Sequence, residues 1–126
     1  MVGLIDTSVF VGVEASRLDA TDLPDQIAVS VVTLAELRLG VLLARGVSAR
    51  QQRLSTLQFA SSLNPVPIDV DVAGEWARIT AELRQSERRA PINDVWIAAL
   101  ALQHSLWLVS RDAHFDHIEG VHRISW

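Results

Sequence analysis

The sequence has no cysteine, and none of its eleven basic residues is a lysine. Without cysteine, the chain has no disulfide framework, no thiolate zinc site and no cysteine nucleophile. Any metal must therefore be bound by oxygen or imidazole ligands, and this favours hard cations. The absence of lysine excludes receiver domains and haloacid-dehalogenase-like phosphatases, because both place a lysine near the phosphoryl group. The absence of a GxxxxGK[ST] loop excludes P-loop nucleotide hydrolysis.

The sequence also lacks a long apolar run and an internal linker. Its longest apolar run, residues 95–102, is far below the roughly 20 residues that a membrane span requires. The N-terminal apolar stretch is interrupted by Asp6 before the apolar part of a signal sequence could form. No Gly/Ser-rich or Pro-rich segment divides the chain, and no segment repeats. We therefore expect one domain spanning residues 1–126, a cytoplasmic location and no membrane partner.

Composition and charge indicate a folded protein that is not strongly basic. Hydrophobic residues make up 49% and charged residues 21% of the chain, which excludes a disordered tail. The formal net charge is −4 and the pI is near 5.4. These values argue against binding of nucleic acid through a bulk positive potential alone.

Short apolar segments alternate with segments of helical periodicity. The pattern predicts strands at residues 2–5, 27–31, 66–68, 106–109 and 122–125. It predicts helices at residues 9–15, 33–45, 48–63, 72–83 and 94–105, with Thr33, Ser48 and Asn93 as helix caps. Because parallel strands need crossover connections, the alternation predicts an α/β fold, a three-layer α/β/α sandwich with a short, mainly parallel central sheet.

Four acidic residues follow predicted strands or open predicted helices, where ligands bind in folds of this kind. They are Asp6, Glu36, Asp94 and Asp112. Each also has a simpler interpretation, since carboxylates at helix N-termini are stabilised by the helix dipole and by free backbone amides. Residues 33–36 even fit a capping box.

The apolar surroundings of these acids favour a metal site. Partly buried carboxylates that converge repel one another unless a cation neutralises them, and no basic residue is adjacent to Asp6 or Asp94. With oxygen ligands, Mg²⁺ or Mn²⁺ fits best. Such a site hydrolyses phosphodiester bonds, because the metal lowers the pKa of a bound water and stabilises charge on the leaving oxygen.

The segments around these acids resemble the four motifs of the PIN-domain ribonucleases, and within them the VapC-type toxins of toxin-antitoxin pairs. The first resembling segment is residues 4–9 (LIDTSV), and the second is residues 30–37 (SVVTLAEL) with Gly40. Asn93-Asp94 with residues 97–99 resembles the third, and residues 108–112 (LVSRD) with His114-Phe115 resemble the fourth. The resemblance covers nearly the whole chain and implies a PIN-like fold.

The resemblance implies roles for several residues. Asp6, Glu36, Asp94 and Asp112 would be the metal-binding catalytic acids, with Asp116 as a residue that could share or replace the role of Asp112. Ser110 could bind a metal water or orient Asp112, or it could simply end a strand. Thr7 and Ser8 could assist at the site, but we favour helix capping for both.

The resemblance also implies an RNA substrate, a homodimer, a VapB-type antitoxin that blocks the site, and a bacterial or archaeal source. The helices predicted after Thr33 and Ser48 carry more apolar surface than one small core needs, including Leu39, Leu42 and Leu43. We expect this surface to bind the antitoxin or a second subunit. Arg84 and Arg88 could contact the RNA backbone, or they could lie on a solvated face.

Two further interpretations concern the aromatic and histidine residues. Trp76, Trp96 and Trp107 lie in apolar segments, so we expect them to pack in the core rather than to stack on bases. The histidines match no standard zinc spacing, and His114 is explained by the fourth motif. The remaining alternative to a nuclease is a catalytically silent binding module in which the acids serve only as helix caps.

Overall fold

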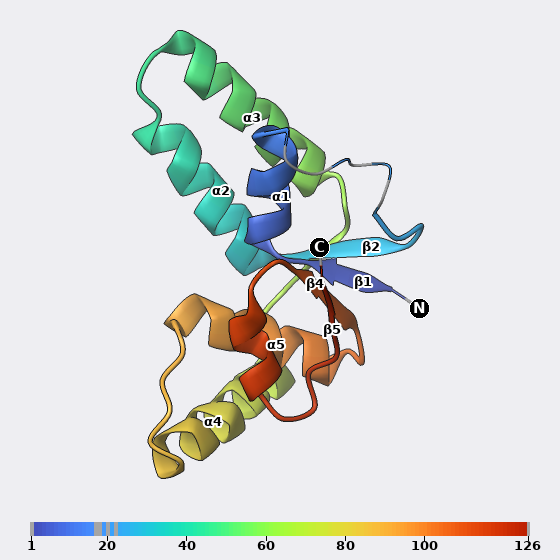
Figure 1. Cartoon of the computed structure of the whole chain (residues 1–126), viewed down its shortest axis with the longest axis vertical. Coiled ribbons are helices and arrows are strands. Elements are labelled where there is room, and N and C mark those ends of the chain that lie inside the picture. The colour runs from blue at the N-terminus through green and yellow to red at the C-terminus, as the bar shows by residue number, and fades with distance from the viewer. Residues whose placement is uncertain (1, 17–18, 20, 22, 126) are drawn as a thin grey trace.

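A five-stranded parallel sheet forms the centre of the molecule (Figure 1). The computed structural model describes residues 2–16, 19, 21 and 23–125. The strands are β1 (Gly3–Ile5), β2 (Ile27–Ser30), β3 (Pro65–Val66), β4 (Trp107–Ser110) and β5 (Arg123–Ser125). Their order in the sheet is β3-β2-β1-β4-β5, and every neighbouring pair is parallel. The predicted parallel sheet is confirmed.

Helices cover both faces of this sheet. One layer contains α1 (Thr7–Glu14), α2 (Val31–Leu43) and α3 (Val47–Ser61), and the other contains α4 (Val70–Gln85) and α5 (Ile92–Gln103). Successive side chains of a strand point to opposite faces, so Leu4 of β1 packs in the core on the α4–α5 side and Ile5 in the core on the α1–α3 side. This is the predicted three-layer α/β/α sandwich.

Helix α5 is the most buried of the helices. Its fully or nearly buried residues are Val95, Ile97, Ala98, Ala99, Leu100 and Ala101. The apolar character of the helix on nearly all sides is explained by its position between the sheet and α4 (Figure 1). Among the described residues, none of the helices is long and apolar enough to cross a membrane.

Three predicted helix caps are wrong. Helix α2 begins at Val31, and its cap is Ser30, whose Oγ accepts a 2.9 Å hydrogen bond from the amide of Thr33. Strand β2 thus leads into the helix without an intervening loop. Helix α3 begins after Gly46, which has the positive φ of 90° that glycine tolerates, rather than after Ser48. Helix α5 begins after Pro91, so Asn93 lies within its first turn.

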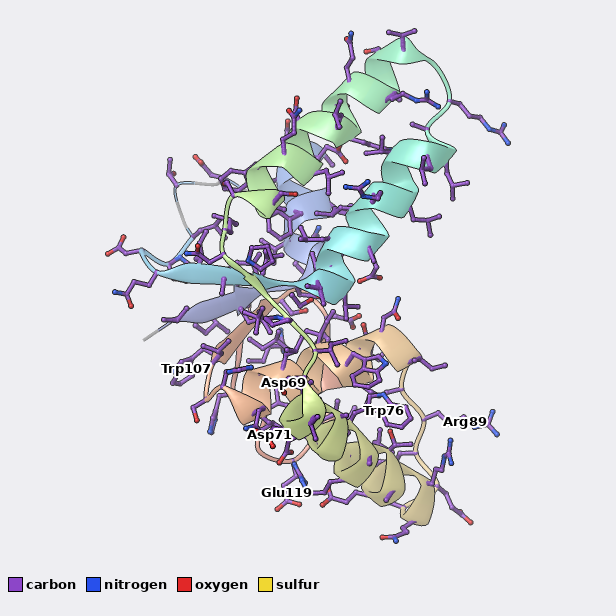
Figure 2. The ribbon with its side chains drawn as sticks, turned by 180° about the vertical axis from the view of Figure 1, so that it is seen from behind. Asp69, Asp71, Trp76, Arg89, Trp107 and Glu119 are labelled. Atoms are coloured by element: carbon purple, nitrogen blue, oxygen red, sulfur yellow. The ribbon has the colours of Figure 1, made fainter. Side chains whose placement is uncertain are left out.

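The tryptophans differ in their packing. Trp76 of α4 and Trp96 of α5 stack with ring centroids 5.0 Å apart against the core, as expected. Trp107 is 39% exposed and lies at the periphery of the molecule (Figure 2), so its predicted core position is wrong. Trp107 begins β4, and its ring packs against the ring of His122, with centroids 5.4 Å apart, rather than in the core.

Candidate metal centre

The four acids lie at the carboxyl-terminal side of the sheet or at the start of helices. Asp6 directly follows β1, and Asp112 lies two residues beyond β4. Asp94 lies in the first turn of α5, and Glu36 lies in the second turn of α2. Because β1, β2 and β4 are parallel, the elements that follow them begin at the same edge of the sheet.

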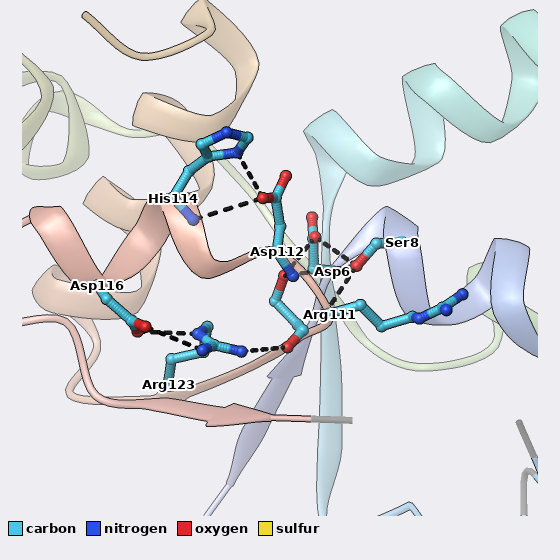
Figure 3. A network of polar contacts seen from close by, with 8 residues as sticks. Asp6, Ser8, Arg111, Asp112, His114, Asp116 and Arg123 are labelled. Carbon is cyan, nitrogen blue, oxygen red and sulfur yellow. Dashed lines mark hydrogen bonds and ion pairs between the residues drawn. The ribbon is translucent and has the colours of Figure 1, made fainter.

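Asp6 is held by two hydroxyl groups. Its side chain is buried, and its Oδ2 accepts hydrogen bonds of 2.8 Å from Ser8 and 2.8 Å from Ser110 (Figure 3). Although Asp6 occupies the N-cap position of α1, its side chain makes no capping hydrogen bond to that helix. The cap interpretation, on which a catalytically silent binding module depends, is therefore wrong for Asp6.

The same two serines hold the segment that carries Asp112. Ser8 Oγ accepts a 3.1 Å hydrogen bond from the amide of Arg111, and Ser110 Oγ accepts one of 3.0 Å from the amide of Asp112. Each hydroxyl therefore joins Asp6 to the segment after β4. The predicted capping role of Ser8 is wrong, and Ser110 does more than end a strand.

Glu36 is held by a hydroxyl of helix α1. Thr7 Oγ1 donates a 2.8 Å hydrogen bond to Glu36 Oε1 and lies 3.1 Å from the hydroxyl of the fully buried Thr33. Contrary to our expectation, Thr7 therefore does not cap α1. Since α2 begins at Val31, Glu36 is too far along the helix to form the predicted capping box with Thr33.

The charges of the other acids change the pKa of Asp94. Burial, together with the charges of Asp6, Asp112 and Glu36, raises the pKa of Asp94 to about 6, while His114 has the opposite effect. The three other acids are therefore close enough to Asp94 to disfavour its ionised form. A bound cation would favour the ionised form of Asp94 and so oppose the effects that raise its pKa.

Three of the side chains in this cluster are arranged as metal ligands. Asp94, Asp112 and His114 each offer one ligand atom, and these atoms all lie within 4.8 Å of one another. His114 Nδ1 also contacts Asp112 Oδ1 (Figure 3). The carboxylate oxygens of Asp94 and Asp112 suit Mg²⁺ or Mn²⁺, the metals that the sequence implied, whereas an imidazole nitrogen is a softer ligand than Mg²⁺ prefers.

His114 joins the candidate ligand group, although the sequence analysis assigned it only to the fourth motif and not to a metal site. The signal was its spacing, two residues after Asp112, because Asp112 caps the 3-10 helix η2 (Ala113–His117) and the first turn of η2 brings His114 back towards it.

Asp116 lies outside this group. Its two carboxylate oxygens accept hydrogen bonds of 2.8 Å and 2.9 Å from Arg123. Of the two aspartates considered for the fourth position, the structure thus groups Asp112 with Asp94 and His114, and it pairs Asp116 with an arginine.

Basic side chains adjoin the acidic cluster. A cavity of about 310 Å³ is lined by Arg88, Arg89, His114 and His117, together with Leu83, Ala90 and Ile118. A second cavity, of about 590 Å³, is lined by Arg84, Arg88 and Arg89 and by part of α4. Arg89 extends outward from the segment between α4 and α5 (Figure 2). His114 belongs both to the metal-ligand group and to the first cavity.

The sequence matches the family described as "PIN domain" over residues 3–121. It is 45% identical to ribonuclease VapC5 of Mycobacterium tuberculosis over 94% of this chain and 88% of the relative. It is 46% identical to ribonuclease VapC4 of the same organism over 97% and 95% of the two chains. The structure resembles that of VapBC-5, a toxin-antitoxin system of M. tuberculosis, with a TM-score of 0.88 and 42% identity over 99% of this chain and 98% of the other. The chain therefore belongs to the PIN-domain family, and within that family to the VapC proteins.

Proposed function

We propose that this protein is a metal-dependent endoribonuclease that acts as the toxin of a toxin-antitoxin pair. The observation that carries the proposal is the cluster around Asp94, where burial and three other carboxylates raise its pKa to about 6 and three side chains offer ligand atoms within 4.8 Å of one another. The names of the relatives, ribonucleases VapC4 and VapC5, support RNA as the substrate.

Asp6, Glu36, Asp94 and Asp112 are the proposed catalytic acids. Asp94 and Asp112 would hold the metal directly, with His114 as a further ligand. Two further acids, Asp6 and Glu36, would complete the negative surface. Ser8 and Ser110 hold Asp6 in place, and Thr7 holds Glu36. Fixed hydroxyl contacts favour catalysis because the carboxylates need no reorganisation when the substrate binds.

The proposed cofactor is Mg²⁺, and Mn²⁺ should substitute because it takes the same carboxylate and water ligands. When bound, such a cation lowers the pKa of the attacking water and neutralises charge on the scissile phosphate. The protein itself holds the ligands, excludes bulk water on the side of the buried Asp6, and keeps Asp112 beside Asp6.

The RNA backbone would pass from the acidic cluster along the cavity lined by Arg88, Arg89 and His117. Arg84 lies in the adjoining cavity and extends this basic surface. On a chain with a net charge of −4, a local cluster of arginines beside the acids provides the attraction for phosphates that the whole protein lacks. We therefore assign Arg84 and Arg88 to RNA binding.

A VapB-type antitoxin or a second subunit would bind the apolar surface at the tip of the α2–α3 hairpin. Leu39, Leu42 and Leu43 are 54%, 69% and 66% exposed, and Val47 is 74% exposed. Exposed large apolar side chains that gather on one part of a protein surface often mark an interface. If the Leu42→Asp/Leu43→Asp variant sediments and binds a coexpressed antitoxin as the wild type does, this assignment is wrong.

The function is tested by incubating the antitoxin-free protein with total bacterial RNA in Mg²⁺, Mn²⁺ or EDTA. We expect discrete cuts with either metal, no cuts in EDTA, and no cuts by the Asp94→Asn variant. Asp71→Asn is the matched control, since Asp71 is an exposed acid in the first turn of α4 and should not matter. Cleavage that survives both EDTA and Asp94→Asn would contradict the proposal.

A further inference from the structure

Arg123 and Asp116 form an ion pair that joins two elements beside the acidic cluster. Arg123 Nε donates a 2.8 Å hydrogen bond to Asp116 Oδ1, and Nη2 donates one of 2.9 Å to Oδ2. Arg123 begins the edge strand β5, whereas Asp116 lies in η2. The pairing lowers the pKa of Asp116 and raises that of Arg123, so both groups carry their charge. A fork of this kind fixes the orientation of both partners.

The same guanidinium group makes a third contact, to the end of β4. Arg123 Nη1 donates a 3.0 Å hydrogen bond to the backbone oxygen of Ser110. Ser110 is fully buried, and its hydroxyl joins Asp6 to the amide of Asp112. Arg123 therefore holds the backbone of the residue whose side chain links two of the catalytic acids (Figure 3).

The ion pair also fixes the 3-10 helix η2. Asp112 is the cap of η2, and His114 lies in its first turn, so a movement of η2 relative to β4 would move two of the three residues in the ligand group. Arg123 contacts both elements at once, because its guanidinium binds Asp116 of η2 and Ser110 of β4. The side chain of Arg123 is only 13% exposed, which limits its freedom to leave this position.

The charge of Arg123 acts in the same direction as its hydrogen bonds. Asp94 and Asp112 offer ligand atoms within 4.8 Å of each other, and two carboxylates this close repel one another when both are ionised. The charge of Asp112 contributes to the raised pKa of Arg123, so attraction between these two groups opposes that repulsion.

We propose that Arg123 is a positioning residue for the metal centre, and that Asp116 serves as the anchor of Arg123 rather than as a metal ligand. Through Ser110 and η2, the pair sets where Asp6 and Asp112 lie relative to each other. The inference depends on the proposed metal-dependent function, because it assigns the pair a role only in preparing that site.

A double-mutant cycle separates an anchor from a ligand. The Kd of Mn²⁺ is measured by titration calorimetry for the wild type, Arg123→Met, Asp116→Asn and the double variant. Residues that hold metal ligands in place typically change metal affinity by about 10- to 100-fold, so we expect Arg123→Met and Asp116→Asn each to raise the Kd at least about tenfold. If Asp116 acts only through Arg123, the double variant should lie within about twofold of Arg123→Met.

Two further variants and two further readouts guard against a trivial loss of stability. Arg78→Met is the matched control. Like Arg123, Arg78 forms ion pairs, but its partners are Glu75 and Glu82 on the exposed face of α4. Arg123→Lys keeps the charge without the fork and should give a Kd between those of the wild type and Arg123→Met. In RNA cleavage, Arg123→Met should lower kcat while leaving KM unchanged, and urea unfolding reports the stability of every variant.

The outcomes separate this inference from the function on which it depends. If the wild type neither binds Mn²⁺ nor cuts RNA, the proposed function fails, and the inference falls with it. If the wild type does both and Arg123→Met binds Mn²⁺ as tightly, the inference alone is overturned. If Asp116→Asn weakens binding by the same factor with and without Arg123, Asp116 acts on the metal independently and its role as an anchor is wrong.

Discussion

Ser110 Oγ donates a 2.8 Å hydrogen bond to Asp6 Oδ2 and accepts one of 3.0 Å from the amide of Asp112. One hydroxyl thus joins two acids that lie more than a hundred residues apart in the sequence. The relationship exists because β1 and β4 are adjacent parallel strands, with Ile5 paired to Val109. The residues after each strand therefore emerge side by side.

The Ser110→Ala variant should bind Mn²⁺ at least about tenfold more weakly, because Asp6 and Asp112 lose their common partner. Its free energy of unfolding should fall by about 1–3 kcal/mol, the usual cost of an unpaired buried polar group. Calorimetry and urea unfolding measure the two effects. Ser61→Ala is the control, since Ser61 bonds only to its own helix through the backbone oxygen of Leu57. Unchanged Mn²⁺ affinity in Ser110→Ala would contradict the role of Ser110.

Metal affinity should depend on the protonation of Asp94. Because its pKa is raised from 3.8 to about 6, Mn²⁺ must displace a proton from Asp94 below that pH. Affinity should therefore rise by about tenfold per pH unit between about pH 5 and 6 and level off above about pH 7. The His114→Ala variant should keep this slope, which separates Asp94 from the imidazole. A flat profile in both proteins would be inconsistent with the raised pKa.

The metal-free protein should show the opposite pH dependence of stability. A raised pKa means that the folded state favours protonated Asp94, so its contribution to stability is fully present below about pH 4 and is lost as the pH rises through about 6. In EDTA, Asp94→Asn should therefore be more stable than the wild type at pH 7.5, and the difference should shrink towards pH 4. Urea unfolding of both proteins across this range makes the comparison, and a difference that does not vary with pH would contradict it.

Asp6 and Asp112 could be predicted from the sequence because they follow apolar strands, and Glu36 and Asp94 because they lie near the start of apolar helices. The hydroxyl partners were assigned wrongly for a physical reason. Ser30 and Thr33 are both residue types that favour the N-cap position, and local sequence cannot choose between them. The choice is made by tertiary structure, since Thr33 is fully buried beside Thr7. The partners of Arg123 depend on the pairing of β4 with β5, which has no local signal.

Thr80 offers a test of packing away from the site. Among residues 2–16, 19, 21 and 23–125, its buried Oγ1 has no hydrogen-bond partner. Replacement by valine keeps the shape of the side chain and removes the unpaired group, so Thr80→Val should stabilise the protein by about 1 kcal/mol. Urea unfolding tests this, and a clear loss of stability would mean that the hydroxyl is paired in solution.

The arginines beside the acidic cluster should contribute to the salt dependence of RNA binding. Removing two phosphate contacts from a single-stranded ligand should lower the slope of log K against log salt by about 1.4. We expect this change when Arg84→Ala and Arg88→Ala are introduced together into a catalytically inactive variant. RNA binding is measured by fluorescence anisotropy. Arg78→Ala serves as the control, because that arginine is already paired with Glu75 and Glu82. An unchanged affinity and slope would reject the assignment.

Convergence of the four acids on one divalent cation is tested most directly by thermal unfolding with and without Mn²⁺. A ligand that binds only the folded state at 100 times its Kd stabilises it by about 2.7 kcal/mol, so the Tm of the wild type and of Asp71→Asn should rise clearly. The Tm of Asp94→Asn should not respond. No response of the wild type, or an equal response of Asp94→Asn, would show that these acids do not form the metal centre.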